Sequence, residues 1–335
     1  MSLAPVAAGA GQPVGAPTTP APSPPDSTPA VAATPSPAAS GPQSALARMV
    51  AEAATRQDGL ASLLANLPVA VATSALADTV RTIAAQLLAA QAPLDGRATA
   101  ADLRAAAQNS GLFLEANLAA TGQPDPAAPQ GPASDLKALL LQLIASLGDV
   151  APAHGQAPRA PPPTAGGALA GQPPAEATLA PGLSPEAMAQ ALSRQAQAAL
   201  ARVQLSQAAS LSADARWAFE APVATPQGAG VAQFEISRDD RGAGAAAASP
   251  TWRARFSIDA PPSGPVHAEL SLSGGRLRLT LTAEDEGARQ ALQAGRDELT
   301  GELAAGHDAD VAVRFVTGAP PRAALAAGRV VDRRT

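Results

Sequence analysis

Histidines and acidic side chains are the residues of this chain best suited to acid–base or metal chemistry, but their spacing supports neither. His154, His267 and His307 lie far apart in the sequence, and no metal-ligand spacing joins them. His267 falls on the polar side of a predicted strand, where a solvated histidine is a simpler interpretation than a general base. Nucleophile, base and orienting group are not clustered anywhere in the sequence. We therefore expect no catalytic residue, no metal site and no cofactor.

Two short motifs have both a chemical and a structural interpretation. Glu284, Asp285 and Glu286 could bind a cation, but acidic residues are also favoured at a helix N-terminus by the helix dipole. Gly274-Gly275 could form a phosphate loop, but it lies between two predicted strands rather than before a helix. The structural interpretation, a helix start and a hairpin turn, is the stronger one for both motifs.

The elements that would position these residues are clearest between residues 252 and 284. Apolar residues alternate with polar ones there in three runs: Trp252, Ala254, Phe256 and Ile258; Val266, Ala268, Leu270 and Leu272; Leu277, Leu279, Leu281 and Ala283. Alternation of period two predicts strands with one apolar face and one face in water. Gly274-Gly275 supplies the positive φ that a two-residue hairpin needs.

Four arginines alternate with the apolar residues of these runs and are expected to share the face in water: Arg253, Arg255, Arg276 and Arg278. Such a face is either simply solvated or a contact surface for an acidic partner.

A helix and further strands complete this module. Ala288, Leu292, Leu299 and Leu303 predict a helix interrupted at Gly295, and residues 311–315 alternate as a short strand. Residues 217–223 and 232–236 alternate in the same way upstream. We predict a small α+β domain over 215–318, built from strands, a β-hairpin, a helix and a final strand. Both tryptophans and four of the five phenylalanines lie within it, as a core requires.

Composition predicts a different character for the rest of the chain. The 335 residues include 34 prolines, 2% aromatic residues and no cysteine, which is too few aromatics for one large core. The predicted fold class is a mostly disordered Ala/Pro-rich chain with short α-helical segments, followed by the small α+β C-terminal domain. The expected divisions before and after that domain are a disordered segment over 1–43, helical segments over 44–148, a Pro/Gly-rich linker over 149–183, a helix over 184–212 and a disordered tail over 319–335.

Leucine spacing and capping residues place the helices. One helix is expected from Leu46 to Leu67, ended by Pro68, and a second over 76–87. A third should run over 136–147, opened by Ser134 or Asp135, and a fourth should begin at Ser184-Pro185-Glu186.

Charge and hydropathy argue against several partners. The net charge of −5 comes without a basic stripe, so no nucleic acid is expected. The densest apolar run, residues 138–147, is too short to span a bilayer, and the first residues lack the basic and apolar regions of a cleaved signal peptide. We expect a chain made in the cytoplasm, without membrane insertion or a small-molecule substrate. Export through an uncleaved N-terminal signal is compatible with this expectation.

The sequence GPVHAELSLSGGRLRLTLTAE, followed by ARQALQAGRDELTGEL, resembles the C-terminal domain of flagellar hook-length control proteins. That family has a Pro-x-Leu-Gly-x-Val entry to a strand, which Pro261, Gly264 and Val266 fit, while Ser263 stands in place of the leucine. The runs WAFEAPV, QFEISRD and WRARFSID also resemble the family, as do SGLFLEANLA and DLKALLLQL in the middle region. The resemblance covers roughly 105–147 and 215–318.

The resemblance implies a molecular ruler that is exported through the flagellar type III apparatus. Its N-terminal part would measure the hook, and its C-terminal domain would bind the cytoplasmic domain of the export gate and switch secretion from hook-type to filament-type substrates. Hook and hook-cap subunits are further implied partners. Pro261, Pro262, Gly264 and Val266 are the implied contact residues for the gate, although proline and glycine there could simply shape the bend.

Three alternatives remain beside this interpretation. A needle-length regulator of a virulence-type secretion system shares the same logic. A non-flagellar structural or binding protein would share the composition. An enzyme with a degenerate site is disfavoured because clustered catalytic residues are missing from the sequence.

Overall fold

The protein is described by a computed structural model that covers residues 42–93, 100–120, 134–148, 162–163, 166–180, 182–211, 216–239, 250–259, 261–306 and 309–319. The expectations of disorder over 1–43 and 319–335 fall almost entirely outside these ranges. His154 and His307 also lie outside the described residues.

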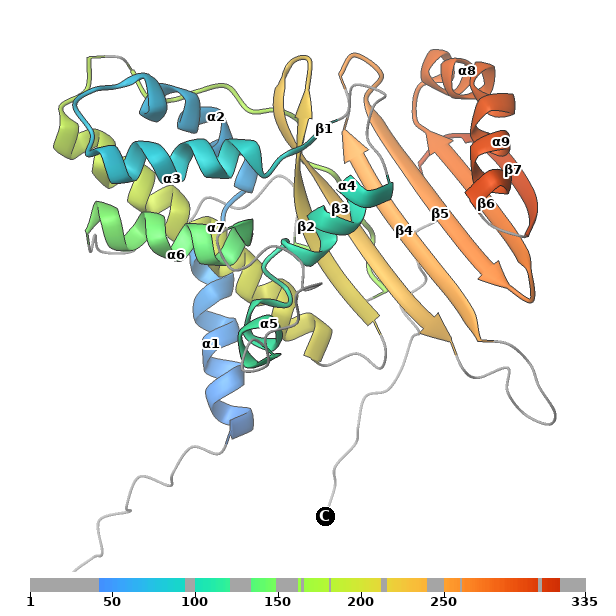
Figure 1. Ribbon diagram of the computed structural model, residues 1–335, viewed down its shortest axis with the longest axis horizontal. Coiled ribbons are helices and arrows are strands. Elements are labelled where there is room, and N and C mark those ends of the chain that lie inside the picture. The colour runs from blue at the N-terminus through green and yellow to red at the C-terminus, as the bar shows by residue number, and fades with distance from the viewer. Residues whose placement is uncertain are drawn as a thin grey trace, which may run out of the picture. The chain divides into compact units, whose positions relative to one another are not determined.

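Helices occupy the first half of the described chain (Figure 1). They are α1 (Pro42–Arg56), α2 (Leu60–Ala72), α3 (Asp78–Ala89), α4 (Ala100–Gln108), α5 (Leu114–Ala120), α6 (Leu136–Leu147) and α7 (Pro185–Leu211). Leucines and alanines from α2, α3, α6 and α7 form one buried cluster, in which Leu63, Leu139 and Leu192 are fully excluded from solvent. Small aliphatic side chains therefore form a packed core here without any aromatic ring.

The capping residues confirm two of the predicted helix starts. Asp135 accepts a hydrogen bond from the Ala138 N–H at 3.1 Å and opens α6. Ser184 accepts one from the Ala187 N–H at 3.2 Å, and Pro185 is the first residue of α7.

The single helix predicted from Leu46 to Leu67 is wrong, because a short non-helical stretch separates α1 from α2. Gly59, in an extended conformation, is the N-cap of α2, and its N–H donates to the Asp58 carboxylate at 2.6 Å. Pro68 does not end α2 but lies inside it. Burial of the leucines before Pro68 and of Ala70 after it outweighs the one backbone hydrogen bond that the proline removes.

The second half forms a seven-stranded sheet in the order β1-β2-β3-β4-β5-β6-β7. The strands are β1 (Ala92–Pro93), β2 (Arg216–Thr225), β3 (Gly228–Asp239), β4 (Thr251–Asp259), β5 (Pro265–Ser273), β6 (Arg276–Ala283) and β7 (Asp310–Thr317). Neighbours from β2 to β6 are antiparallel, whereas β1 and β7 pair in parallel with the two outer strands of that set. The predicted hairpin at Gly274-Gly275 joins β5 to β6, with φ of 55° and 74° at the two glycines.

The strand register defines two faces, which we call the apolar face and the polar face. One row across the apolar face pairs Phe219, Phe234, Phe256, Ala268, Leu281 and Phe315. The adjacent row across the polar face pairs Glu220, Gln233, Ser257, His267, Thr282 and Val316. The four arginines expected on one face do lie together on the polar face.

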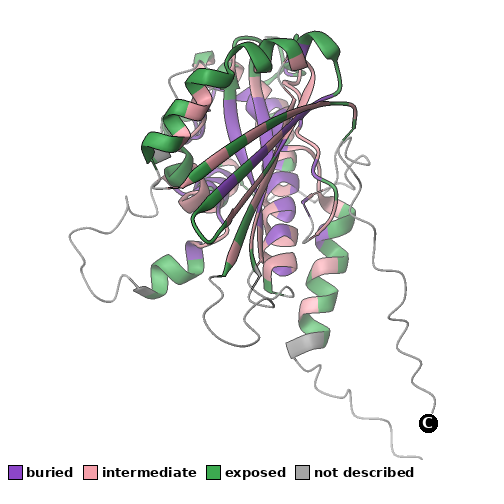
Figure 2. Ribbon diagram, turned by 90° about the vertical axis from the view of Figure 1, so that its right-hand side faces the viewer, coloured by how far each residue is buried: buried purple, intermediate pink, exposed green. Residues whose placement is uncertain are grey.

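In the described part of the chain, helices cover the two sides of the apolar face. Ala106 of α4 packs on Val223 and Ala232, while Leu299 and Leu303 pack on Leu279 and Leu281. The latter two leucines come from α9 (Arg296–Gly306), which follows α8 (Glu286–Ala294) after the predicted break at Gly295. Exposed positions predominate on α8 and α9 (Figure 2). Between the helices, the rings of Trp217 and Trp252 stack at 6.5 Å.

The predicted order of helices followed by an α+β sheet domain is confirmed. The described residues bury their apolar side chains in three separate clusters: one in the helical half, one around β1 to β3, and one under α9.

Candidate functional site

The predicted contact residues lie in and beside the connection from β4 to β5. Pro261 and Pro262, joined by a cis peptide bond, and Gly264 form the loop, and Pro262 is exposed. Gly264 has φ of 71°, and an added Cβ would meet no atom within 4 Å, so the backbone conformation alone favours glycine. Val266 instead pairs with Ile258 and Ala283 inside the sheet. Of the four predicted contact residues, Pro262 is therefore the exposed one, while the other three are half-buried.

Three ionisable groups lie on the polar face next to this loop. Burial raises the pKa of Asp259 above its ordinary value, and the charge of Glu284 raises it further. Burial lowers the pKa of His267, while Glu284 opposes that shift. The Nε2 atom of His267 is buried and has no hydrogen-bond partner among the described residues. The expectation of a solvated His267 is therefore wrong for the Nε2 atom, which is excluded from solvent.

The shift of His267 predicts a pH dependence of stability. A depressed pKa means that the folded state favours neutral imidazole, so its contribution is complete above pH 6.5 and is lost as the pH falls toward the lower folded-state pKa. Going from about pH 7.5 to about pH 5.5 should lower the melting temperature of the wild type more than that of His267→Gln. Thermal unfolding at several pH values measures this difference. Equal pH slopes for both proteins would contradict the assignment; Asp259 acts in the opposite direction and is common to both.

The acidic run at the start of α8 is explained by local contacts. Asp285 caps the helix by accepting a hydrogen bond from the Ala288 N–H at 2.9 Å. Glu286 accepts hydrogen bonds from Arg289, Thr317 and Gln290, which lower its pKa to about 2 although its side chain is exposed. Within the described ranges, no group of three or more histidine or acidic residues is arranged to hold a metal ion.

A groove of about 280 Å³ opens on the polar face across β4 to β7. Arg255, His267, Glu269 and Arg314 line it together with Leu169, which comes from a segment before α7. Side chains of both signs of charge line this groove, which suits it to polar ligands.

We call residues 166–180 the strap, because this extended segment lies on the polar face of the sheet. The N–H groups of Ala170 and Gly171 donate to Gln233 Oε1 and Ser257 Oγ at 2.9 and 3.1 Å. Gln172 and Val231 exchange two backbone hydrogen bonds at 2.8 and 2.9 Å. The sequence predicted a linker over 149–183, whereas the described part of it over 166–180 is packed against the sheet. Buried polar side chains of the sheet supply the hydrogen-bond partners that hold it there.

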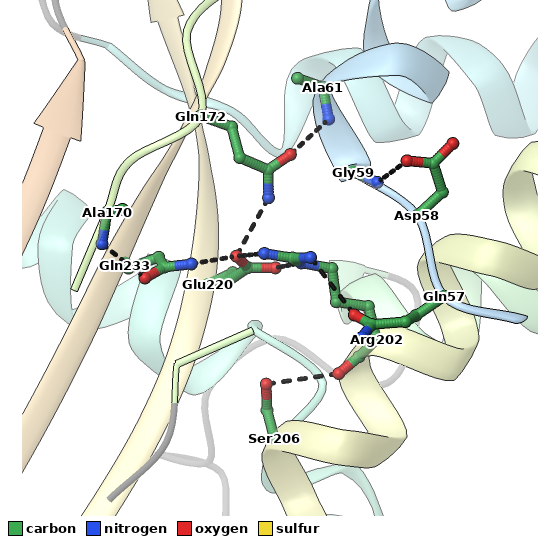
Figure 3. A network of polar contacts seen from close by, with 10 residues as sticks. All are labelled: Gln57, Asp58, Gly59, Ala61, Ala170, Gln172, Arg202, Ser206, Glu220 and Gln233. Atoms are coloured by element: carbon green, nitrogen blue, oxygen red, sulfur yellow. Dashed lines mark hydrogen bonds and ion pairs between the residues drawn. The ribbon is translucent and has the colours of Figure 1, made fainter. Parts of the chain in front are cut away.

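A buried ion pair joins the helical half to the sheet (Figure 3). Arg202 of α7 donates to both oxygens of Glu220 in β2, at 2.5 and 2.7 Å, and the two side chains are 1% and 7% exposed. Glu220 Oε1 also accepts hydrogen bonds from Gln172 and Gln233, at 3.0 and 2.9 Å. The strap, α7 and two strands thus meet at a single carboxylate.

Sequence reasoning missed this network. Arg202 continues the buried stripe of α7 that includes Met188, Leu192 and Ala199, and a charge on that stripe was the available signal. Glu220 alternates with apolar neighbours as any solvent-facing strand residue would. The expectation of a polar face in water is consequently wrong at β2 to β4, where Gln233 and Ser257 are fully buried.

The module from β4 to β7, with its hairpin and two helices, is the part of the chain that matches a known family. Residues 240–323 match the family model described as flagellar hook-length control protein FliK. The resemblance inferred from the C-terminal sequence is thereby confirmed for this region. We call residues 240–323 the hook-length control region, after the family that they match. This region contains β4 to β7 with α8 and α9, whereas β2, β3, the strap and the helical half precede it. The resemblance over 105–147 lies outside the match and stays a prediction.

Two further comparisons add little to this match. The crystal structure of the PscP SS domain is 27% identical over 19% of this chain and 69% of that chain, with a TM-score of 0.18, which does not establish a shared fold. Curated proteins gave no match. The matched family is described by its control of hook length. None of the helices in the described part of the chain is long and apolar enough to cross a bilayer.

Proposed function

We propose that this protein controls the length of the flagellar hook as an exported molecular ruler. In this proposal the hook-length control region binds the cytoplasmic domain of the type III export gate and switches secretion from hook-type to filament-type substrates. The observation that carries the proposal is the family match over residues 240–323, which coincides with a folded strand-and-helix module. The protein would be made in the cytoplasm and leave through the flagellar apparatus, without a cleaved signal peptide.

The architecture is consistent with a chain that must pass a narrow channel. The helical core is built from leucine and alanine rather than large aromatic residues, and the sequence contains no cysteine that could lock it covalently. The N-terminal part would meet hook and hook-cap subunits during passage, while the C-terminal module supplies a rigid surface for a transient contact.

The loop Pro261–Gly264 is the proposed contact with the gate, with Val266 supporting it from within the sheet. Pro262 is exposed and Gly264 holds a left-handed conformation, so the loop presents a defined shape to a partner.

Electron microscopy of hooks in the source cell tests the proposed function. Deleting the gene should give overlong hooks without filaments. Hooks of normal length that carry filaments would show that the proposal is wrong. Altered secretion needles together with unaltered hooks would instead support a needle-length regulator.

Complementation of the deletion with variants tests the contact loop. Ser263→Asp adds a charge within the loop and keeps both prolines and Gly264, so the protein should fold but filaments should stay rare. Gly301→Asp on α9 introduces the same charge at an open position, since no atom lies within 4 Å of an added Cβ, and it should restore filaments. Equal rescue by both variants would remove the loop from the contact surface.

A further inference from the structure

The polar face of β3 and β4 has the properties of a binding surface for an extended peptide, and we call this surface the seat. Glu235, Gln233 and Ser257 are all buried, and each accepts a hydrogen bond from a backbone N–H of the strap. Arg255 donates to the Gly167 carbonyl oxygen at 3.0 Å. These side chains contact the main chain of the strap, so the seat recognises a conformation more than a particular sequence.

One position of the seat does select a residue type. A Cβ atom on Gly171 would lie 2.6 Å from Asp259 N and 2.7 Å from Ile258 Cα, both of which are backbone atoms of β4. Backbone cannot move aside as a flexible side chain can, so a bound segment needs glycine there. The next residue, Gln172, donates from Nε2 to Glu220. The seat therefore selects glycine followed by a hydrogen-bond donor side chain, such as glutamine, arginine or lysine.

The seat continues beyond the strap. Leu169 of the strap lines one side of the 280 Å³ groove, and His267, Glu269 and Arg314 line its floor over β5 and β7. The buried Nε2 atom of His267 lacks a partner among the described residues and borders this groove. The groove lies beside Leu169, so a bound segment with a longer side chain at that position would meet polar groups there.

The strap is also tied to the helical half. The side-chain oxygen of Asn66 in α2 accepts hydrogen bonds from the N–H groups of Thr178 and Leu179, at 2.8 and 3.0 Å. Gln172 Oε1 accepts one from the Ala61 N–H at 3.3 Å. The strap is followed in the sequence by α7, which carries Arg202, the ion-pair partner of Glu220. Withdrawal of the helices would remove both the strap and Arg202 from the sheet.

We propose that the polar face of β3 and β4 is a binding surface for an extended segment of a partner protein, with glycine followed by a donor side chain, and that the strap masks it in cis. Withdrawal of the helical half uncovers the seat and leaves the Glu220 carboxylate without its guanidinium. The peptide-binding seat stands independently of the proposed function; only the timing of its exposure, during export, rests on that function. The strap belongs to the same chain as the seat and is joined to α7 by a few residues. Its effective concentration at the seat is therefore about millimolar, so a partner segment binds weakly until the strap leaves.

Fluorescence anisotropy with the purified full-length chain tests the masking. The probe is a labelled synthetic peptide with the sequence of residues 166–180. Gly171→Val displaces the strap of the chain without altering the seat, and should raise affinity for the probe at least about tenfold over wild type. Gly182→Ala is the matched control, because no atom lies within 4 Å of an added Cβ and the strap should stay seated. A probe peptide that carries Gly171→Val should not bind any of these proteins.

A second release variant and a hydrogen-exchange measurement complete the test. Ala170→Pro removes the N–H that Gln233 accepts and serves as a second release variant if Gly171→Val fails to fold. Hydrogen exchange of the wild type should show the strap amides opening at lower free energy than the β3 amides. Strap amides that exchange only with β3, or a released variant that binds the probe no better than wild type, would overturn the proposal. Neither result depends on the hook phenotype, so the proposed function could stand or fall separately.

Discussion

Replacing Arg202 by methionine should lower the free energy of unfolding by about 3–5 kcal/mol. The substitution keeps most of the side-chain volume but leaves the Glu220 carboxylate buried at 7% exposure without a cation. Gln172 and Gln233 still donate to Glu220, yet neutral donors do not compensate for a buried charge. Urea unfolding should be followed by tryptophan fluorescence, which reports Trp217 and Trp252 of the sheet, and by circular dichroism, which reports the helices.

Two variants separate the ion pair from a general effect on α7. Arg194→Met lies on the exposed side of the same helix and should change stability by less than about 0.5 kcal/mol. The double variant Arg202→Met/Glu220→Gln removes both charges and should recover most of the loss. If Arg202→Met alone stays within about 1 kcal/mol of wild type, the pair is not the link between the two halves that the geometry indicates.

Leu139→Ala should cost about 2–5 kcal/mol, because it opens a cavity in the cluster shared by α2, α3, α6 and α7. Leu139 is completely buried, and a close-packed interior relaxes only partly around a deleted side chain. The circular dichroism transition should shift to lower urea concentration. The fluorescence transition should shift less, because the sheet has its own apolar clusters.

Leu141→Ala on the same helix is the matched comparison. Leu141 is 45% exposed, so the same chemical change should cost about 1 kcal/mol or less. Equal losses for the two leucines would mean that the helical half is not packed as described.

Local patterns predicted the elements well because they report local geometry. Alternation identified β4, β5 and β6, and Gly274-Gly275 identified the hairpin through its positive φ. Asp135 and Ser184 marked helix starts because a cap needs only the next three residues. The prediction that Pro68 ends a helix failed, because tertiary burial of α2 overrode the local helix-breaking preference of proline.

The candidate site was predicted only in part. The loop Pro261–Gly264 was found through a family motif, and its exposure agrees with a contact role that remains a proposal. The seat formed by Gln233 and Ser257 was not found, because a polar residue that alternates with apolar ones is the ordinary pattern of a strand face in water.

By itself the sequence determined the strands, the hairpin, the capped helices and the resemblance to hook-length control proteins over the C-terminal region. Only the tertiary structure decided which face of the sheet is exposed to solvent. The period of a strand says which residues share a face, but not what covers that face. Here the cover comes from the strap and α7, whose donors satisfy Glu220 and Gln233 across long stretches of chain. Hydrogen bonds between residues so distant in sequence leave no trace in a local pattern, because each partner alone is an ordinary surface residue.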